Sequence, residues 1–151
     1  KSDPWAVAGR IAWGEERAMF SGPYRTPLAD LFSLLRPVRL PDQVIHGDLA
    51  WENVLFHAHL PPAVIDFSPS WRPAGWAAAI ATNDALAWEG ADASILATVD
   101  HLPEFYQLLA RATIMRLVVA EGNFRAGRDR EASDLTCHLP VIEICLSRTG
   151  R

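Results

Sequence analysis

The sequence has only two cysteines, a single lysine and no long apolar run. Cys137 and Cys145 are eight residues apart on one predicted helix, and the resulting separation of about 12 Å is too long for an intrachain disulfide. We therefore expect two buried thiols in a reducing compartment. No run approaches the length of a membrane span, and residues 1–4 do not resemble a signal peptide, so we expect a cytoplasmic protein without a membrane partner.

Basic residues do not outnumber acidic ones. The 151 residues include 14 Lys and Arg against 18 Asp and Glu, which gives a net charge of -4. This balance excludes the strongly positive surface that binds nucleic acid, so we expect no nucleic-acid partner. Hydrophobic residues make up 50% of the chain. A chain of this length and composition can bury one core, so we expect a single domain over residues 1–151.

A polar motif between apolar runs is the most informative part of the sequence. Residues 46–55 are HGDLAWENVL, and residues 63–68 are AVIDFS. Asp48 precedes Asn53 by five residues, and Asp66 follows Asn53 by thirteen. The apolar runs around the motif predict a hairpin with a buried first strand at 54–56, a turn at 60–62 and a returning strand at 63–65. Such a hairpin would bring Asp66 back beside Asn53.

Two carboxylates and an amide in this order suit phosphoryl transfer. The protein's task in that reaction is to position the attacking hydroxyl and to hold the metal ion that neutralises phosphate charge. Mg²⁺ prefers oxygen ligands and takes few of them from the protein. A kinase-type site uses an Asp as the base, then an Asn and a second Asp as ligands of Mg²⁺ and, through it, of ATP or GTP; Asp48, Asn53 and Asp66 have these types in this order.

In these residues the chain resembles the aminoglycoside phosphotransferase and choline kinase-like family, whose members are relatives of the protein kinases. The catalytic loop of that family reads His-Gly-Asp-Leu, three variable residues and Asn, and a hydrophobic-Ile-Asp-Phe run follows; residues 46–55 and 64–67 match both patterns. The resemblance implies that Asp48 is the catalytic base and that Asn53 and Asp66 are ligands of Mg²⁺. It implies that His46 is a buried loop residue that braces the site. It also implies that Asp84 in the next helix hydrogen-bonds the catalytic loop, with ordinary solvation of its carboxylate and substrate binding as the alternatives.

The resemblance implies an α+β, mainly helical fold: the C-terminal lobe of a protein-kinase-like fold, with a small β-hairpin that carries the catalytic and metal-binding loops. Asp3-Pro4 predicts the cap of a first helix that extends to about residue 19. Periodicity predicts further helices at 27–35, from 74 onward, and at about 92–99, 103–121 and 129–147. A strand at 43–45 is expected to lead into His46, and residues 68–73 are expected to be irregular.

The elements that grip the nucleotide phosphates in a kinase are missing from the sequence. It contains no G-x-G-x-x-G loop and no lysine that a strand could carry. Gly122 and Gly127 have the spacing of a P-loop but are followed by Arg-Asp, so they predict an interhelical loop. We therefore expect the chain to be inactive alone and to partner an N-terminal nucleotide-binding lobe of the same protein.

The expected acceptor is a small molecule with a hydroxyl group, such as an aminoglycoside, choline, a sugar or an amino alcohol. Cationic acceptors are held by carboxylates and aromatic faces. The candidates for such a pocket are Glu52, Trp71, Trp76, Trp88 and Glu89. The helical spacing of Trp76 and Trp88 also favours a place in the core.

Two other functions remain open from the sequence. In the first, His46, Asp48, His57 and His59 form a transition-metal cluster for hydrolysis, although the last two are expected at an exposed hairpin tip. In the second, the chain is a non-catalytic binding or scaffold module that keeps the kinase-like fold without a grip on nucleotide. The missing lysine and Gly-rich loop motivate this second alternative.

Overall fold

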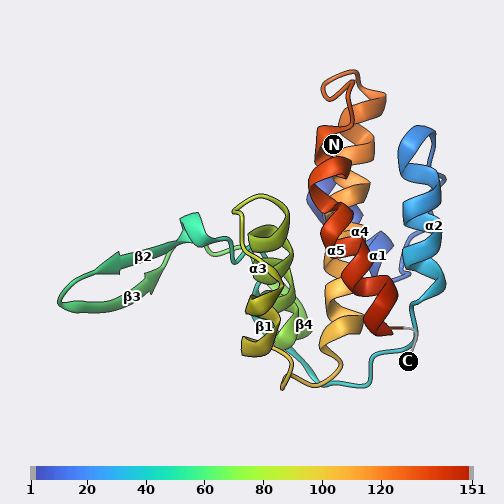
Figure 1. The fold of residues 1–151 in the computed structure, drawn as a ribbon. Helices are drawn as coiled ribbons and strands as arrows, with labels where there is room; N and C mark the ends of the chain where they lie inside the picture. Colours follow the sequence, from blue (N-terminus) through green and yellow to red (C-terminus); the bar gives the residue numbers. More distant parts are fainter. Residues whose placement is uncertain (1–2, 150–151) are drawn as a thin grey trace.

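The computed structural model describes residues 3–149, which form an α+β, mainly helical fold with two small antiparallel sheets (Figure 1). The helices in this range are α1 (Pro4–Ala12), α2 (Arg25–Ser33), α3 (Gly75–Ala87), α4 (Phe105–Arg125) and α5 (Ser133–Thr149). The strands are β1 (Asp42–His46), β2 (Val54–His57), β3 (Leu60–Val64) and β4 (Pro69–Pro73). Three 3₁₀ helices are η1 (Gly22–Tyr24), η2 (Trp51–Asn53) and η3 (Ala93–Thr98). None of the described helices is both long enough and apolar enough to cross a bilayer.

Helix α4 is the centre of the core. It packs against α1, α2, α3 and α5, and most of its residues are buried. A helix that is apolar on nearly every side is stable only when other elements surround it. The fully buried apolar side chains at these contacts include Leu108, Leu109, Ile114 and Leu117 of α4, Leu28 and Leu31 of α2, Ile80 of α3 and Val141 of α5.

Helix α1 begins as expected but ends early. The Asp3 carboxylate accepts hydrogen bonds from the backbone N–H groups of Trp5 and Ala6, and Pro4 occupies the first helical position. The helix ends at Ala12, so the prediction of a helix to residue 19 is wrong. Gly14 adopts a φ of 74°, and the N–H groups of residues 14 and 15 bond back to the carbonyls of residues 11 and 10. This is the Schellman ending that favours glycine.

Helix α4 also ends in a Schellman motif. Gly127 has a φ of 70°, and the N–H groups of residues 127 and 128 bond to the carbonyls of residues 124 and 123. Gly122 therefore lies inside the helix, which runs four residues beyond the predicted end at 121. The expected interhelical loop is confined to residues after Arg125. The other helices differ from the prediction by a few residues at their ends, and the helix expected at 92–99 is the 3₁₀ helix η3.

Strands β1 and β4 form the sheet that leads into the candidate site. They pair antiparallel from Asp42 opposite Pro73 to His46 opposite Pro69. The expected strand before His46 is confirmed, whereas the expected irregular segment at 68–73 is mostly strand β4. The prolines at both ends of this segment favoured a loop, but a short edge strand tolerates proline at its ends.

Strands β2 and β3 form the predicted hairpin, but it is not buried. The turn lies at residues 58–59, and Leu60-Pro61-Pro62 belongs to β3. Figure 1 shows this hairpin projecting from the helical body on the side of α3. We call five apolar side chains of the hairpin and of the residue that follows it, which are 44–77% exposed, the hairpin surface: Leu55, Phe56, Leu60, Val64 and Ile65. The expectation of a buried strand at 54–56 is wrong because no described element packs against the hairpin.

The two cysteines both lie on α5 but differ in environment. Cys145 is buried, and burial raises the pKa of its thiol to about 12. Cys137 is exposed, so the expectation of two buried thiols is wrong for this residue. The buried residue, Cys145, contacts Thr113 of α4.

Candidate functional site

His46 connects the two halves of the sequence motif. Its Nδ1 accepts a hydrogen bond from the backbone N–H of Asp48 at 3.2 Å. The other nitrogen, Nε2, therefore carries the proton and donates to the carbonyl oxygen of Ile65 at 3.0 Å. The imidazole also lies edge-on to the ring of Phe67, with 5.6 Å between centroids. His46 is thus in the bracing position expected of it, between the Asp48 loop and the segment that carries Asp66.

Asn53 closes the loop that begins at Asp48. Its Nδ2 donates to the carbonyl oxygen of Asp48 at 2.9 Å, and its own carbonyl accepts from the N–H of Ile65 at 2.9 Å. The residue is buried, with 8% of its surface exposed. Because Nδ2 is engaged, the amide oxygen Oδ1 is the atom left to bind a ligand.

Asp66 has an unusual backbone conformation. Its φ is 53°, in the left-handed region that few residues other than glycine, Asn and Asp adopt. Its carboxylate is exposed and has no hydrogen-bond or ion-pair partner among residues 3–149. Backbone strain of this kind concentrates at functional sites. A free carboxylate here and the free Oδ1 of Asn53 are hard oxygen donors, so the residues present fit Mg²⁺, which needs only one or two protein ligands.

Gly47 permits the close approach of β1 to the strand after Asp66. Its N–H donates to the carbonyl of Ser68 at 2.7 Å. A Cβ atom on residue 47 would lie 3.0 Å from the Cβ of Ser70 and 3.1 Å from the Ser68 carbonyl oxygen. Any larger residue would push the Asp48 loop away from this strand, since packed neighbours resist such overlap.

Arg116 of α4 joins Asp48 to Asp84, and sequence reasoning missed it. Its Nε donates to Oδ1 of Asp84 at 2.9 Å, and its Nη2 donates both to Asp84 Oδ2 and, at 3.2 Å, to Asp48 Oδ1. The side chains of Arg116 and Asp84 are 6% and 4% exposed, whereas that of Asp48 is 46% exposed. The expected direct bond from Asp84 to the catalytic loop is not among the described contacts; Arg116 makes the connection.

The surroundings of Arg116 stabilise its charge. Burial lowers the pKa of its guanidinium, but the hydrogen bonds and charges of Asp84 and Asp48 outweigh burial, so the pKa lies above its ordinary value. Trp5 and Trp88 lie 4.8 and 5.7 Å from the guanidinium carbon, at distances typical of cation–π contacts. The signal that could have identified Arg116 is a lone charge within the apolar run ATIMRLVV, residues 112–119.

A buried polar network continues from Asp84 to α5. Asn83 Nδ2 donates to Asp84 Oδ1 at 3.0 Å and lies 3.3 Å from Nε2 of His138, while Asn83 Oδ1 accepts from the Thr113 hydroxyl at 3.0 Å. His138 Nδ1 donates to the carbonyl of Asp134 at 2.7 Å, so Nε2 is the acceptor for Asn83. The network links α3, α4 and α5 beneath the candidate site.

His138 makes stability depend on pH. Burial lowers its pKa below the ordinary 6.5, so below pH 6.5 the unfolded chain binds a proton that the folded chain does not. The contribution of neutral His138 to the free energy of unfolding is therefore expected to be fully present above pH 6.5. It is expected to fall as the pH drops from there toward the pKa of His138 in the folded chain. Denaturant unfolding at pH 7.5, 6.5 and 5.5 measures this slope. His138→Gln is expected to reduce the change of unfolding free energy with pH. His101→Asn, a control at an exposed histidine, is expected to retain that change. An equal pH dependence in the two variants would contradict the role assigned to His138.

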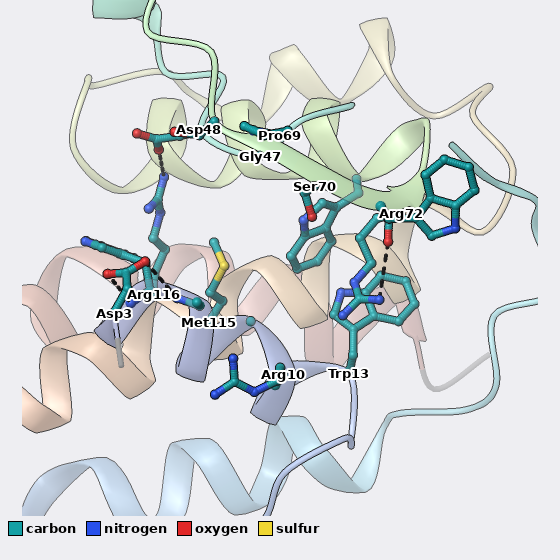
Figure 2. Close-up of a pocket in the computed structure, with 16 residues that line it drawn as sticks. Asp3, Arg10, Trp13, Gly47, Asp48, Pro69, Ser70, Arg72, Met115 and Arg116 are labelled. Carbon is teal, nitrogen blue, oxygen red and sulfur yellow. Dashed lines mark hydrogen bonds and ion pairs between the residues drawn. The ribbon is translucent and has the colours of Figure 1, made fainter. Parts of the chain in front are cut away.

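A cavity of about 570 Å³ opens beside Asp48 (Figure 2). It lies between α1, the β1–β4 sheet and α4, and its wall includes the predicted pocket residues Trp71 and Trp76. Trp76 is also a core residue, as expected, with 3% of its surface exposed. The other predicted pocket residues, Glu52, Trp88 and Glu89, do not line this cavity.

Trp88 and Glu89 lie in a different setting from the one expected. Trp88 is 45% exposed, so its predicted place in the core is wrong; it covers Arg116 and meets the ring of His138 edge-on. Burial, followed by the charges of Asp84 and Glu52, raises the pKa of Glu89 above its ordinary value. These acidic groups lie near one another, outside the cavity.

The transition-metal alternative has no geometric support. His57 ends β2 and His59 lies in the hairpin turn, where both are exposed and their rings lie 5.9 Å apart. Across the described part of the chain, no three or more His, Cys, Asp or Glu side chains gather in a group that could hold a metal ion. A hydrolytic cluster of His46, Asp48, His57 and His59 is therefore not formed.

Comparison with known proteins adds no assignment to this geometry. No family model matches the chain, and neither a curated protein nor a solved structure matches it.

Proposed function

We propose that the chain is the catalytic and acceptor-binding lobe of an ATP- or GTP-dependent phosphotransferase of the aminoglycoside phosphotransferase and choline kinase-like type. The observation that supports this proposal best is the closed loop from Asp48 to Asp66. Asn53 donates to the Asp48 carbonyl and accepts from Ile65, and His46 bonds to both ends of the same loop. These bonds hold the segments that carry the three candidate residues around the base of one hairpin.

Each residue has a distinct role in the proposed reaction. The Asp48 carboxylate orients the acceptor hydroxyl and accepts its proton, through the oxygen that Arg116 does not hold. Oδ1 of Asn53 and the Asp66 carboxylate hold the metal ion. Mg²⁺, when bound, supplies neutralisation of the charge on the nucleotide phosphates. His46 and Arg116 neither accept the proton nor hold the metal ion in this proposal; they position the loop and Asp48.

The hairpin surface supports a second lobe as the partner. Its five apolar side chains lie on or directly after a two-stranded hairpin that the described elements leave uncovered. Large exposed apolar patches mark interaction sites. The sequence holds neither a Gly-rich loop nor a strand-borne lysine. We therefore propose that a nucleotide-binding lobe of the same protein supplies both and packs on the hairpin surface.

A thermal-shift comparison tests this proposal. The chain alone and the chain joined to its nucleotide-binding lobe are heated with and without Mg²⁺-ATP and Mg²⁺-GTP. Stabilisation confined to the joined form is expected, since ligand at 100 times its Kd adds about 2.7 kcal/mol. The absence of any shift in the joined form would contradict the proposal and favour the non-catalytic binding module.

A further inference from the structure

The cavity beside Asp48 does not include the proposed metal ligands. Its wall includes Gly47, Asp48 and Arg116 but neither Asn53 nor Asp66. Figure 2 shows Arg116 reaching across one end of the cavity to Asp48. Its volume of about 570 Å³ lies in the range of small-molecule sites. If Asp48 has the proposed function, this is where the acceptor hydroxyl would lie.

Tryptophans make up much of the cavity wall. Trp5 and Trp13 come from α1 and the residue that follows it, Trp71 comes from β4, and Trp76 comes from α3. Trp13 and Trp76 meet edge to face, 5.4 Å apart, and the Arg72 guanidinium lies 4.8 Å from the centroid of the Trp13 ring. Trp5 and Trp71 are 45% and 62% exposed. Exposed indole faces around a cavity favour a ligand with a planar apolar body, because rings stack on such faces.

The acidic groups of the cavity are already engaged. The two oxygens of Asp3 accept from N–H groups at the start of α1. Oδ1 of Asp48 accepts from Arg116, which leaves only the oxygen proposed to bind the acceptor hydroxyl. A polycationic acceptor needs several free carboxylates, and this cavity does not offer them.

The basic groups of the cavity are more available. Arg10 and Arg72 lie in the wall and pair with Glu16 at 3.1 Å and Glu15 at 2.7 Å. Arg10 and Glu16 are each 42% exposed, whereas Arg72 and Glu15 are 21% and 44% exposed. An ion pair that is exposed on both sides, such as Arg10–Glu16, is weak enough for a ligand to compete with it. Each guanidinium also has donors that these pairs do not use. The charge in the wall therefore disfavours a cation and accommodates an anion.

We infer that this cavity binds a hydroxyl compound with a planar aromatic body and no positive charge, unlike choline or an aminoglycoside. Its role as the acceptor of phosphate rests on the proposed function, whereas its binding preference rests on the cavity alone. The tryptophans hold the ring, Arg10 and Arg72 accommodate a neutral or anionic substituent, and the hydroxyl lies toward Asp48.

Three probes with one body and different charges test the inference: 4-(2-hydroxyethyl)benzoate, 2-phenylethanol and 4-(2-hydroxyethyl)benzylamine. Their dissociation constants for the chain are measured by NMR titration without metal or nucleotide. The benzoate is expected to bind about tenfold more tightly than the amine. The double variant Arg10→Gln/Arg72→Gln is expected to remove that difference. Tighter binding of the amine, or no binding of any probe at millimolar concentration, would overturn the inference.

A pair of tryptophan variants locates the site. Trp71→Ala is expected to weaken the binding of all three probes by about tenfold, because the ring of each probe loses its stacking partner. Trp51→Ala removes an indole that is 65% exposed and outside the cavity, and it is expected to change nothing. Equal effects of the two variants would overturn the assignment to this cavity. The assay contains no nucleotide. A failure to bind Mg²⁺-ATP would therefore contradict the proposed function but would leave the binding preference of the cavity unaffected.

Discussion

Replacing Asp48 by Asn is expected to lower kcat by roughly 10²- to 10⁴-fold, the usual contribution of a positioned general base. The measurement is phosphoryl transfer by the chain joined to its nucleotide-binding lobe. The asparagine keeps an oxygen that can accept from Arg116, so the variant removes the charge and the proton-accepting group while it preserves the contact at 3.2 Å. The affinity for Mg²⁺-nucleotide is expected to change little, because Asp48 is not a proposed metal ligand.

The control for Asp48→Asn is the same change at an exposed aspartate on α2, Asp30→Asn. Asp30 is remote from the motif in sequence, and its carboxylate makes no hydrogen bond within the described residues. The Asp30→Asn variant is expected to leave kcat unchanged. Turnover that is equally unaffected in both variants would contradict the role assigned to Asp48.

Replacing Arg116 by Met is expected to lower the free energy of unfolding by about 3–5 kcal/mol. The change leaves Asp84, which is 4% exposed, without its ion-pair partner in the core. Breaking a buried pair costs this much because a buried charge remains uncompensated. Denaturant unfolding of the chain measures the change. The exposed-pair control Arg10→Met, where both partners are 42% exposed, is expected to cost only about 0–1 kcal/mol.

A double variant separates the cost of the orphaned charge from the cost of altered packing. Arg116→Met/Asp84→Leu replaces both buried charges by apolar groups, and such replacements are often neutral for stability. The double variant is therefore expected to recover most of the loss caused by Arg116→Met. A double variant that is less stable than the single one would contradict this account of the pair.

Local signals in the sequence were sufficient where one short segment decides the structure. The Asp3-Pro4 cap, the strand into His46 and the existence of the hairpin each follow from a few neighbouring residues. The end of α1 was missed because two glycines compete for it: Gly14 ends the helix with a φ of 74°, whereas the more obvious Gly22-Pro23 pair begins η1. Both are helix-ending signals, and only the backbone conformation decides between them.

Long-range features could not be predicted from local patterns. The apolar run at 54–56 is typical of a buried strand, but burial depends on what packs against it, and no described element covers the hairpin. Arg116 was missed because its partners Asp48 and Asp84 are 68 and 32 residues away in sequence. The cavity likewise joins α1 to the motif through residues that share no sequence pattern.

The most direct test of the proposed metal and nucleotide site is a calorimetric titration of Mg²⁺-ATP and Mg²⁺-GTP. It compares the chain joined to its nucleotide-binding lobe with its Asp66→Asn variant. Asparagine tolerates the φ of 53° at this position, so the variant removes the charge without adding backbone strain. We predict that the unaltered protein binds both Mg²⁺-nucleotides. The variant is expected to bind them at least roughly 10- to 100-fold more weakly, since changing a residue in the outer shell of a metal site already lowers affinity by this factor. Equal Kd values for the two proteins would contradict the proposed site.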